Sequence, residues 1–166
     1  MNSDTNAFKD IRISCVELSR IAFLPTESFD PNSLTLLACL KKVEEKLSAY
    51  EDDSLSPKFA DYVFVPIASL LKQPALGESQ TEYVLLIIFH LLRTCWSSNG
   101  KFSEQLGQQL FPLITFLVSS DKDNQKLITR SDEFKYAGCL VLHQFFKSVR
   151  SQRYHKEFFS NSKPNL

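Results

Sequence analysis

Apolar residues recur along the chain at intervals of three and four positions, which is the period of one face of an α-helix. Alternation with a period of two, the pattern of a half-buried strand, is scarce, and glycine occurs only four times. The pattern predicts an all-α fold of about six helices, separated by polar segments that contain proline, glycine or serine. The predicted helices cover residues 6–23, 33–50, 56–72, 80–96, 103–119 and 132–150.

Capping residues and the width of the apolar face refine this prediction. Ser56 has the residue type of an N-cap, and Pro57 is suited to the first helical position. The helix at 80–96 is apolar on nearly every side, which is typical of a helix covered by neighbours in the middle of a stack. The first two helices each have one apolar face, formed by Phe8, Ile11, Cys15, Leu18 and Ala22, and by Leu37, Leu40, Val43, Leu47 and Tyr50.

Two helical hairpins in the chain resemble each other. The segments 83–92 and 136–145 match at an offset of 53 residues, and the helices before them match at an offset of 46. The equivalent positions are Pro66 and Pro112, Tyr83 and Tyr136, and His90 and His143.

A period of about 40–47 residues built from two helices is typical of HEAT and armadillo-type repeats. Because one hairpin cannot bury both of its faces, copies stack into a solenoid. We therefore predict an α-solenoid of three antiparallel hairpins. The predicted divisions are a divergent first hairpin as N-terminal cap (1–50), a second repeat (51–98), a third repeat (99–150) and a frayed or disordered tail (151–166).

Pro66 and Pro112 each come more than two turns after the predicted start of their helices. A proline there removes one backbone hydrogen bond and clashes with the carbonyl four residues earlier, at about 3 kcal/mol. We expect both helices to bend, which frees the carbonyls of Tyr62 and Gln108. The alternative is a helix that ends and restarts at the proline.

The last predicted helix has apolar residues on two sides. If a following repeat is missing, one side lies bare, and the chain is then expected to bind a hydrophobic dye or to self-associate. Tyr136, Leu142, Phe146 and Val149 form one side, and Phe134, Val141 and Phe145 form the other. The candidate surface for packing at this open end comprises Phe134, Val141, Phe145, Phe146 and Val149.

Charge and composition narrow the class of partner. Lysine and arginine together number 19, as do aspartate and glutamate, so the net charge is zero. A dedicated nucleic-acid binder carries a basic face, and docking on anionic lipid also needs one, so neither partner is indicated. The start of the chain lacks the pattern of a secretory signal, and the apolar run 83–89 is too short for a membrane span. We expect an intracellular protein that contacts neither nucleic acid nor membrane.

Residues capable of chemistry are scattered rather than grouped. Cys15, Cys39, Cys95 and Cys139 form no paired zinc-ligand spacing, so we interpret them as reduced, buried thiols. No phosphate-binding loop, metalloprotease motif or nucleophile elbow occurs. We interpret His90 as a structural histidine bonded across the seam of its hairpin, and His143 likewise. The sequence therefore predicts a scaffold for proteins with no catalytic residue, metal or cofactor.

Two stretches resemble the Tel-two-interacting protein one family. Residues 7–19 match its N-terminal signature, and residues 62–74 match a following segment in which tyrosine, three apolar residues and proline precede a Leu-Lys-x-Pro sequence. The matching positions, interpreted as structural, are Phe8, Ile11, Arg12, Cys15, Val16, Leu18, Tyr62, Pro66, Leu71, Lys72 and Pro74. Ile13 departs from the pattern, since proline is expected after the basic residue.

This resemblance implies a non-catalytic segment of a subunit of the TTT co-chaperone complex, whose subunits in yeasts belong to the ASTRA assembly. Such a subunit works with an Hsp-ninety-type chaperone to mature and stabilise PI-three-kinase-related protein kinases. The implied partners are the other TTT subunits, the chaperone machinery and these kinases, in cytoplasm and nucleus. Because the family's proteins are long HEAT solenoids, we expect this chain to be their first segment.

Two other classes of function stay open at this stage. A short helical solenoid is also found in trafficking adaptors of the VHS and ENTH type, which bind sorting signals or phosphoinositides. Only Lys9, Arg12 and Arg20 are available for a basic patch near the N-terminus, which disfavours that class. Nothing in the sequence supports the other class, an enzyme whose site is assembled from distant helices.

Overall fold

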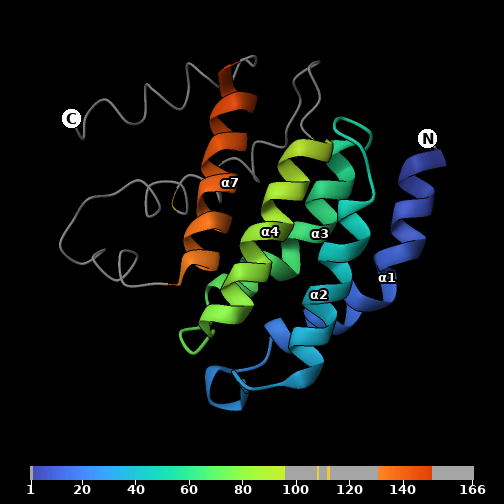
Figure 1. The fold of residues 1–166 in the computed structure, drawn as a ribbon. Coiled ribbons are helices and arrows are strands. Elements are labelled where there is room, and N and C mark those ends of the chain that lie inside the picture. The colour runs from blue at the N-terminus through green and yellow to red at the C-terminus, as the bar shows by residue number, and fades with distance from the viewer. Residues whose placement is uncertain (1, 96–107, 109–111, 113–130, 151–166) are drawn as a thin grey trace.

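The computed structural model describes residues 2–95, 108, 112 and 131–150, and all of its regular structure in these ranges is helical. The prediction of an all-α fold is therefore confirmed for this part of the chain (Figure 1). The elements are α1 (Asn2–Ala22), the 3-10 turn η1 (Thr26–Ser28), α2 (Leu34–Ser48), α3 (Pro57–Leu71), α4 (Glu78–Cys95) and α7 (Asp132–Arg150). The helix predicted at 103–119 falls outside the described ranges except for residues 108 and 112, which are both helical.

The starts of α2 and α3 follow from local sequence. Ser33 is the N-cap of α2, and its hydroxyl accepts a hydrogen bond from the backbone N–H of Leu36 at 3.2 Å. Pro57 occupies the first position of α3 after an extended Ser56, as predicted. The connection between α2 and α3 turns at Asp53, whose φ of 57° is left-handed.

Helix α3 runs without interruption through Pro66, which is buried. The alternative of a helix that ends and restarts there is wrong, and the bend stays a prediction. Tyr62, whose carbonyl the proline leaves unbonded, lies at the surface with 37% of its area exposed. Pro112 is helical and exposed, and the residues on either side of it lie outside the described part of the chain, so its bend stays a prediction.

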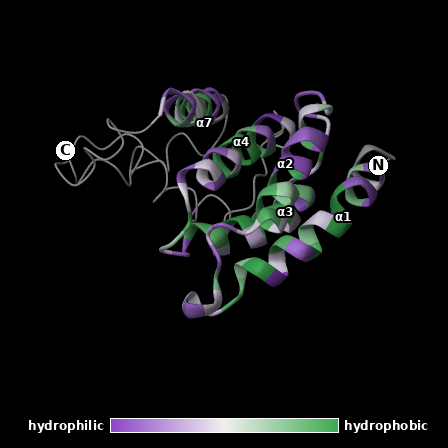
Figure 2. Cartoon of the chain, turned by 60° about the horizontal axis from the view of Figure 1, so that its bottom comes forward, coloured by the Kyte–Doolittle hydropathy of each residue, from purple (hydrophilic) through white to green (hydrophobic). Residues whose placement is uncertain are grey.

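The helices form two layers. Helices α2, α4 and α7 lie side by side in one row, and α1 and α3 form a second row beneath them (Figure 2). Within a row the helices run in the same direction, whereas α1 and α2, and α3 and α4, form antiparallel pairs (Figure 1). This is the packing of stacked helical hairpins, in which each pair contacts its neighbour through both layers.

The core explains the apolar pattern of each helix. Helix α4 contacts α2, α3 and α7, which is why it is apolar on nearly every side. The predicted face of α1 is confirmed, with Phe8 half-buried and the other four residues buried. In α2 one residue differs: Leu36 is fully buried, whereas the predicted Leu37 is only half-buried.

Helix α7 corrects the predicted open end. Phe134, Val141 and Phe145 are buried in the core on the side of α7 that meets α4, so they form no open surface. The exposed side carries Tyr136, which is 64% exposed, and Phe146, which is 37% exposed. The side chain of Val149 lies outside the described part of the structure.

The predicted equivalence of α4 and α7 does not extend to the surroundings of matched residues. His90 is buried, whereas its counterpart His143 is exposed. Tyr83 packs against the core, whereas Tyr136 is exposed. The buried side of α7 is therefore formed by other positions than those that its sequence match with α4 predicts. The divisions of the chain at 50/51, 98/99 and 150/151 stay predictions.

Candidate functional site

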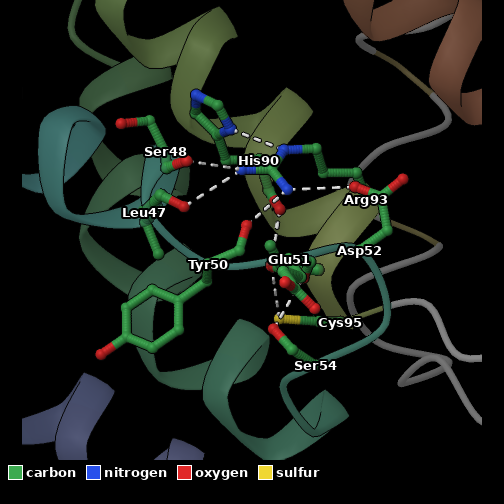
Figure 3. Close-up of polar contacts among 10 residues, drawn as sticks. Leu47, Ser48, Tyr50, Glu51, Asp52, Ser54, His90, Arg93 and Cys95 are labelled. Atoms are coloured by element: carbon green, nitrogen blue, oxygen red, sulfur yellow. Dashed lines mark hydrogen bonds and ion pairs between the residues drawn. The ribbon is translucent and has the colours of Figure 1, made fainter.

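Among the described residues, a dense polar cluster lies where the connection between α2 and α3 meets the end of α4 (Figure 3). The guanidinium of Arg93 donates to the carbonyls of Tyr50 (2.6 Å), Leu47 (3.2 Å) and Ser48 (3.3 Å). Its Nη1 also donates to Asp52 Oδ1 at 3.1 Å. Arg93 thereby binds carbonyls at the end of α2, where the carbonyl of Leu47 also accepts from the backbone N–H of Tyr50 at 3.1 Å.

His90 completes this cluster from the same helix. Its Nδ1 accepts a hydrogen bond from Arg93 Nε at 2.9 Å, so the ring proton lies on Nε2, which donates to Glu44 Oε1 at 3.2 Å. Burial lowers the pKa of His90, the positive charge of Arg93 lowers it further, and Glu44 opposes both. Glu44 belongs to α2, so the predicted bond across the hairpin of α3 and α4 is wrong. His90 instead joins two successive hairpins.

This cluster is suited to structure rather than to chemistry. A guanidinium has five N–H donors, and those of Arg93 make five hydrogen bonds. No donor is left for a substrate oxygen. Across the described ranges, His, Cys, Asp and Glu form no group of three that could hold a metal ion. No described helix is both long and apolar enough to cross a membrane.

Two further polar contacts fix the positions of the helices. Gln73, which follows α3, is buried, and its Nε2 donates to the carbonyls of Ala22 (3.1 Å) and Leu24 (2.9 Å) at the end of α1. At the start of α7, the backbone N–H of Ser131 donates to Glu78 Oε1 at 2.8 Å. Hydrogen bonds at the ends of the helices therefore connect neighbouring helices in addition to the contacts in the core.

The four cysteines are free, but they do not share one environment. Cys15 and Cys95 are buried as predicted, and burial raises the pKa of Cys15 to about 12. Cys39 is half-buried, and burial is the main cause that raises its pKa. Cys139 is exposed on α7, so the prediction of a buried thiol is wrong there.

Exposed hydrophobic side chains concentrate on the layer formed by α1 and α3. The described residues include eight large hydrophobic side chains with high exposure, and five of them lie on α1, on α3 or directly after α1. These five are Ile13, Val16, Phe23, Tyr62 and Val65.

Four of these residues share one side of the layer with basic residues. Along α1 the spacings are three, four and seven residues, and along α3 they are four, three and seven, so each set lies along one side of its helix. We call this surface the α1–α3 face. It comprises Lys9, Arg12, Val16 and Phe23 from α1 and its end, and Lys58, Tyr62, Val65 and Lys72 from α3 and its end.

The two halves of the α1–α3 face are held in register at both ends. Near the start, the ring of Phe8 stacks on the rings of Phe59 and Tyr62 at centroid distances of 5.2 and 5.1 Å. At the far end, Gln73 bonds the carbonyls that end α1. Burial raises the pKa of Tyr62, and the charge of Arg12 opposes this rise.

Comparison with known families identifies the chain. The family model described as the TTI1 N-terminal TPR domain matches residues 8–166. The chain belongs to this family. No solved structure matches it.

Membership of the TTI1 N-terminal TPR domain family confirms the family predicted from residues 7–19 and 62–74. TPR and HEAT repeats both consist of stacked helix pairs, so the family description agrees with the predicted α-solenoid. A helical repeat of this kind binds other proteins through its extended surfaces. The TTI1-type chain is therefore an interaction domain.

The family-motif residues separate into two groups in the structure. Ile11, Cys15, Leu18 and Pro66 are buried, Phe8 and Leu71 are half-buried, and these six contribute to the packing. The remaining residues are exposed, so a role in packing alone does not account for them. These are Arg12, Val16, Tyr62, Lys72 and Pro74.

Sequence reasoning missed Phe23 and Val65 as surface residues. The exposure of Val65 could have been predicted from the helical period. Val65 lies three residues after Tyr62, on the side of the helix opposite the buried Phe59, Val63 and Ile67. Helix α3 is so apolar overall that its exposed side is not evident from composition. Ile13, which departs from the family pattern, is 81% exposed in the middle of α1, where the helix continues unbroken.

Proposed function

We propose that this chain is a non-catalytic scaffold segment of a TTI1-type subunit of the TTT complex, whose subunits in yeasts also belong to the ASTRA assembly. In this role it supports the maturation and stability of PI-three-kinase-related protein kinases by an Hsp-ninety-type chaperone. The observation that carries the proposal is the family match over residues 8–166. The partners are the other TTT subunits, the chaperone machinery and the kinases, and the compartments are cytoplasm and nucleus.

Two features of the structure support a scaffold rather than an enzyme. The dense polar cluster uses every donor of Arg93 to hold the chain connection in place. The exposed hydrophobic residues gather on one helical layer, as expected of a surface that binds another protein. These features favour the scaffold over an enzyme.

Depletion of the gene product tests this proposal. The steady-state amounts of several PI-three-kinase-related kinases are measured by immunoblotting, with unrelated kinases as controls. We expect the related kinases to decrease together and the controls to remain constant. Unchanged amounts of the related kinases would reject the proposal.

Re-expression tests whether residues 1–166 alone can support kinase stability. Three stacked repeats with helices about 10 Å apart extend only about 30 Å, which is too short to bridge a subunit, a chaperone adaptor and a large kinase. We expect residues 1–166 alone not to restore kinase amounts in depleted cells. Full restoration by this segment would contradict its role as one part of a longer scaffold.

A further inference from the structure

The α1–α3 face combines an apolar centre with positive charge. Val16, Tyr62 and Val65 form the centre, with exposed fractions of 59%, 37% and 54%. Basic residues lie at both ends of this centre. These are Lys9 and Arg12 in the first half of α1, Lys58 at the start of α3, and Lys72 at the end of α3.

The positive charge on this face is not neutralised locally. Among the described residues, the structure pairs none of these four basic residues with a carboxylate. Arg20 is different, because Glu17 binds it through two hydrogen bonds that together form an ion pair. Asp61 is the exposed acidic residue on this side of α3. The face therefore carries a net positive charge although the whole chain carries none.

The shape of the face suits a helix. Helices α1 and α3 run side by side in the same direction (Figures 1 and 2). The apolar centre of the face consists of two valines and one tyrosine. The short side chains of the two valines allow a third helix to approach to the 8–10 Å that helix packing requires. From Arg12 to Phe23 the face extends about 16 Å, which is the length of about three helical turns.

From these observations we infer that the α1–α3 face is the docking surface for an acidic amphipathic helix of a partner protein. Its apolar side covers Val16, Tyr62 and Val65, and its flanking carboxylates meet Arg12 and the neighbouring lysines. Tyrosine and arginine are the residue types enriched where binding energy concentrates. The inference rests on the scaffold role proposed above and specifies the chemistry of one partner.

Charge and side-chain length disfavour two other occupants. A second copy of the chain would place like charges opposite each other across the interface. A membrane surface attracts lysine and arginine, but stable insertion also needs long apolar side chains that reach the acyl chains. Of the apolar residues of this face only Phe23 and Tyr62 have long side chains, and the valines between them are too short to insert. An acidic helix matches both the positive charge and the shape of the α1–α3 face.

The test uses two synthetic probe peptides of the same length, helix content and leucine-rich side. One has glutamate on both flanks of the leucines and the other has lysine at the same positions. Binding to the whole chain is measured by fluorescence anisotropy at low and high salt. We expect the glutamate peptide to bind about tenfold more tightly than the lysine peptide at low salt, with a smaller difference at high salt.

Variants then locate the binding surface. Tyr62→Ala and Val16→Asp are expected to weaken binding of the glutamate peptide about tenfold, and Arg12→Glu is expected to abolish its advantage over the lysine peptide. Tyr136→Ala and Lys135→Glu make matched changes on the exposed side of α7 and are expected to leave binding unchanged. Because Tyr62 also stacks on Phe8, Val16→Asp provides the test if Tyr62→Ala unfolds the chain.

Several outcomes would overturn the inference. The first is equal binding of the two peptides. The second is a loss of glutamate-peptide binding in the α7 variants as large as in the α1–α3 variants. The third is self-association of the chain, measured by sedimentation, that Val16→Asp abolishes. Binding to phosphatidylcholine vesicles with about 30% phosphatidylserine, lost in the same α1–α3 variants, would assign the face to a membrane. None of these measurements depends on kinase amounts. The docking surface and the proposed co-chaperone role can therefore fail separately.

Discussion

Arg93 is expected to be the polar side chain whose removal destabilises the fold most. Its side chain is 13% exposed and binds the end of α2, the connection to α3 and His90. Arg93→Ala removes all five hydrogen bonds and leaves the carbonyls of Leu47 and Tyr50 without these donors. A buried polar group that loses its partner costs more than an exposed one, because water replaces the lost bond poorly.

The size of the effect follows from the burial of each partner. The bonds to His90 and to the carbonyls of Leu47 and Tyr50 are partly buried and contribute about 1 kcal/mol each. The ion pair with Asp52, which is 64% exposed, contributes about 0–1 kcal/mol. We therefore expect Arg93→Ala to lower the free energy of unfolding by about 3–4 kcal/mol. For a chain of this length, that shifts Tm by about 10 °C.

Thermal and urea unfolding followed by circular dichroism at 222 nm measures this loss. Arg93→Lys keeps the charge but has three donors instead of five, so we expect an intermediate Tm. Arg20→Ala is the matched control, because Arg20 is exposed and bound only to Glu17, and its Tm is expected to equal that of the wild type. If Arg93→Ala is as stable as Arg20→Ala, the cluster does not hold the connection as argued.

Three further predictions concern titration, hydrogen bonding and thiol reactivity. Because the pKa of His90 is lowered in the folded state, the unfolded state binds the proton more readily, so stability should fall as pH drops below about 6.5, the ordinary pKa of histidine. His90→Gln should reduce this loss in urea unfolding between pH 7 and 5, and His143→Gln on the exposed side of α7 should not. Gln73→Glu replaces the donor to two carbonyls by an acceptor and should cost about 2–4 kcal/mol in urea unfolding, and a stable variant would contradict the role of Gln73. Iodoacetamide labelling of the native chain, followed by mass spectrometry, should modify exposed Cys139 quickly and buried Cys15 slowly, and equal rates would contradict the assigned exposures.

Helices and their limits were largely predictable from the sequence, because the determinants are local. Ser33 and Pro57 fix the starts of α2 and α3 through backbone geometry that depends only on neighbouring residues. The period of three and four residues identified the buried side of α1, since burial follows from the helix itself. The continuity of α3 through Pro66 was not predictable to the same degree, because packing against other helices offsets the local cost.

Relations between helices were less predictable. Helix α7 has apolar residues on two sides, and its sequence does not specify that the side with Phe134 and Phe145 packs toward α4. The buried state of His90 was expected, but its partner Glu44 lies in another hairpin, and no local pattern links the two. The α1–α3 face was missed for the same reason, because its residues come from two segments and form one surface only when the helices pack.

The most direct test of the co-chaperone role measures the fate of newly made kinase. Cells are depleted of the gene product, pulse-labelled, and chased while PI-three-kinase-related kinases are immunoprecipitated. A scaffold for chaperone-dependent maturation predicts that newly made kinase decays faster after depletion, whereas kinase made before depletion keeps its normal half-life. Equal decay of newly made kinase with and without depletion would contradict the account.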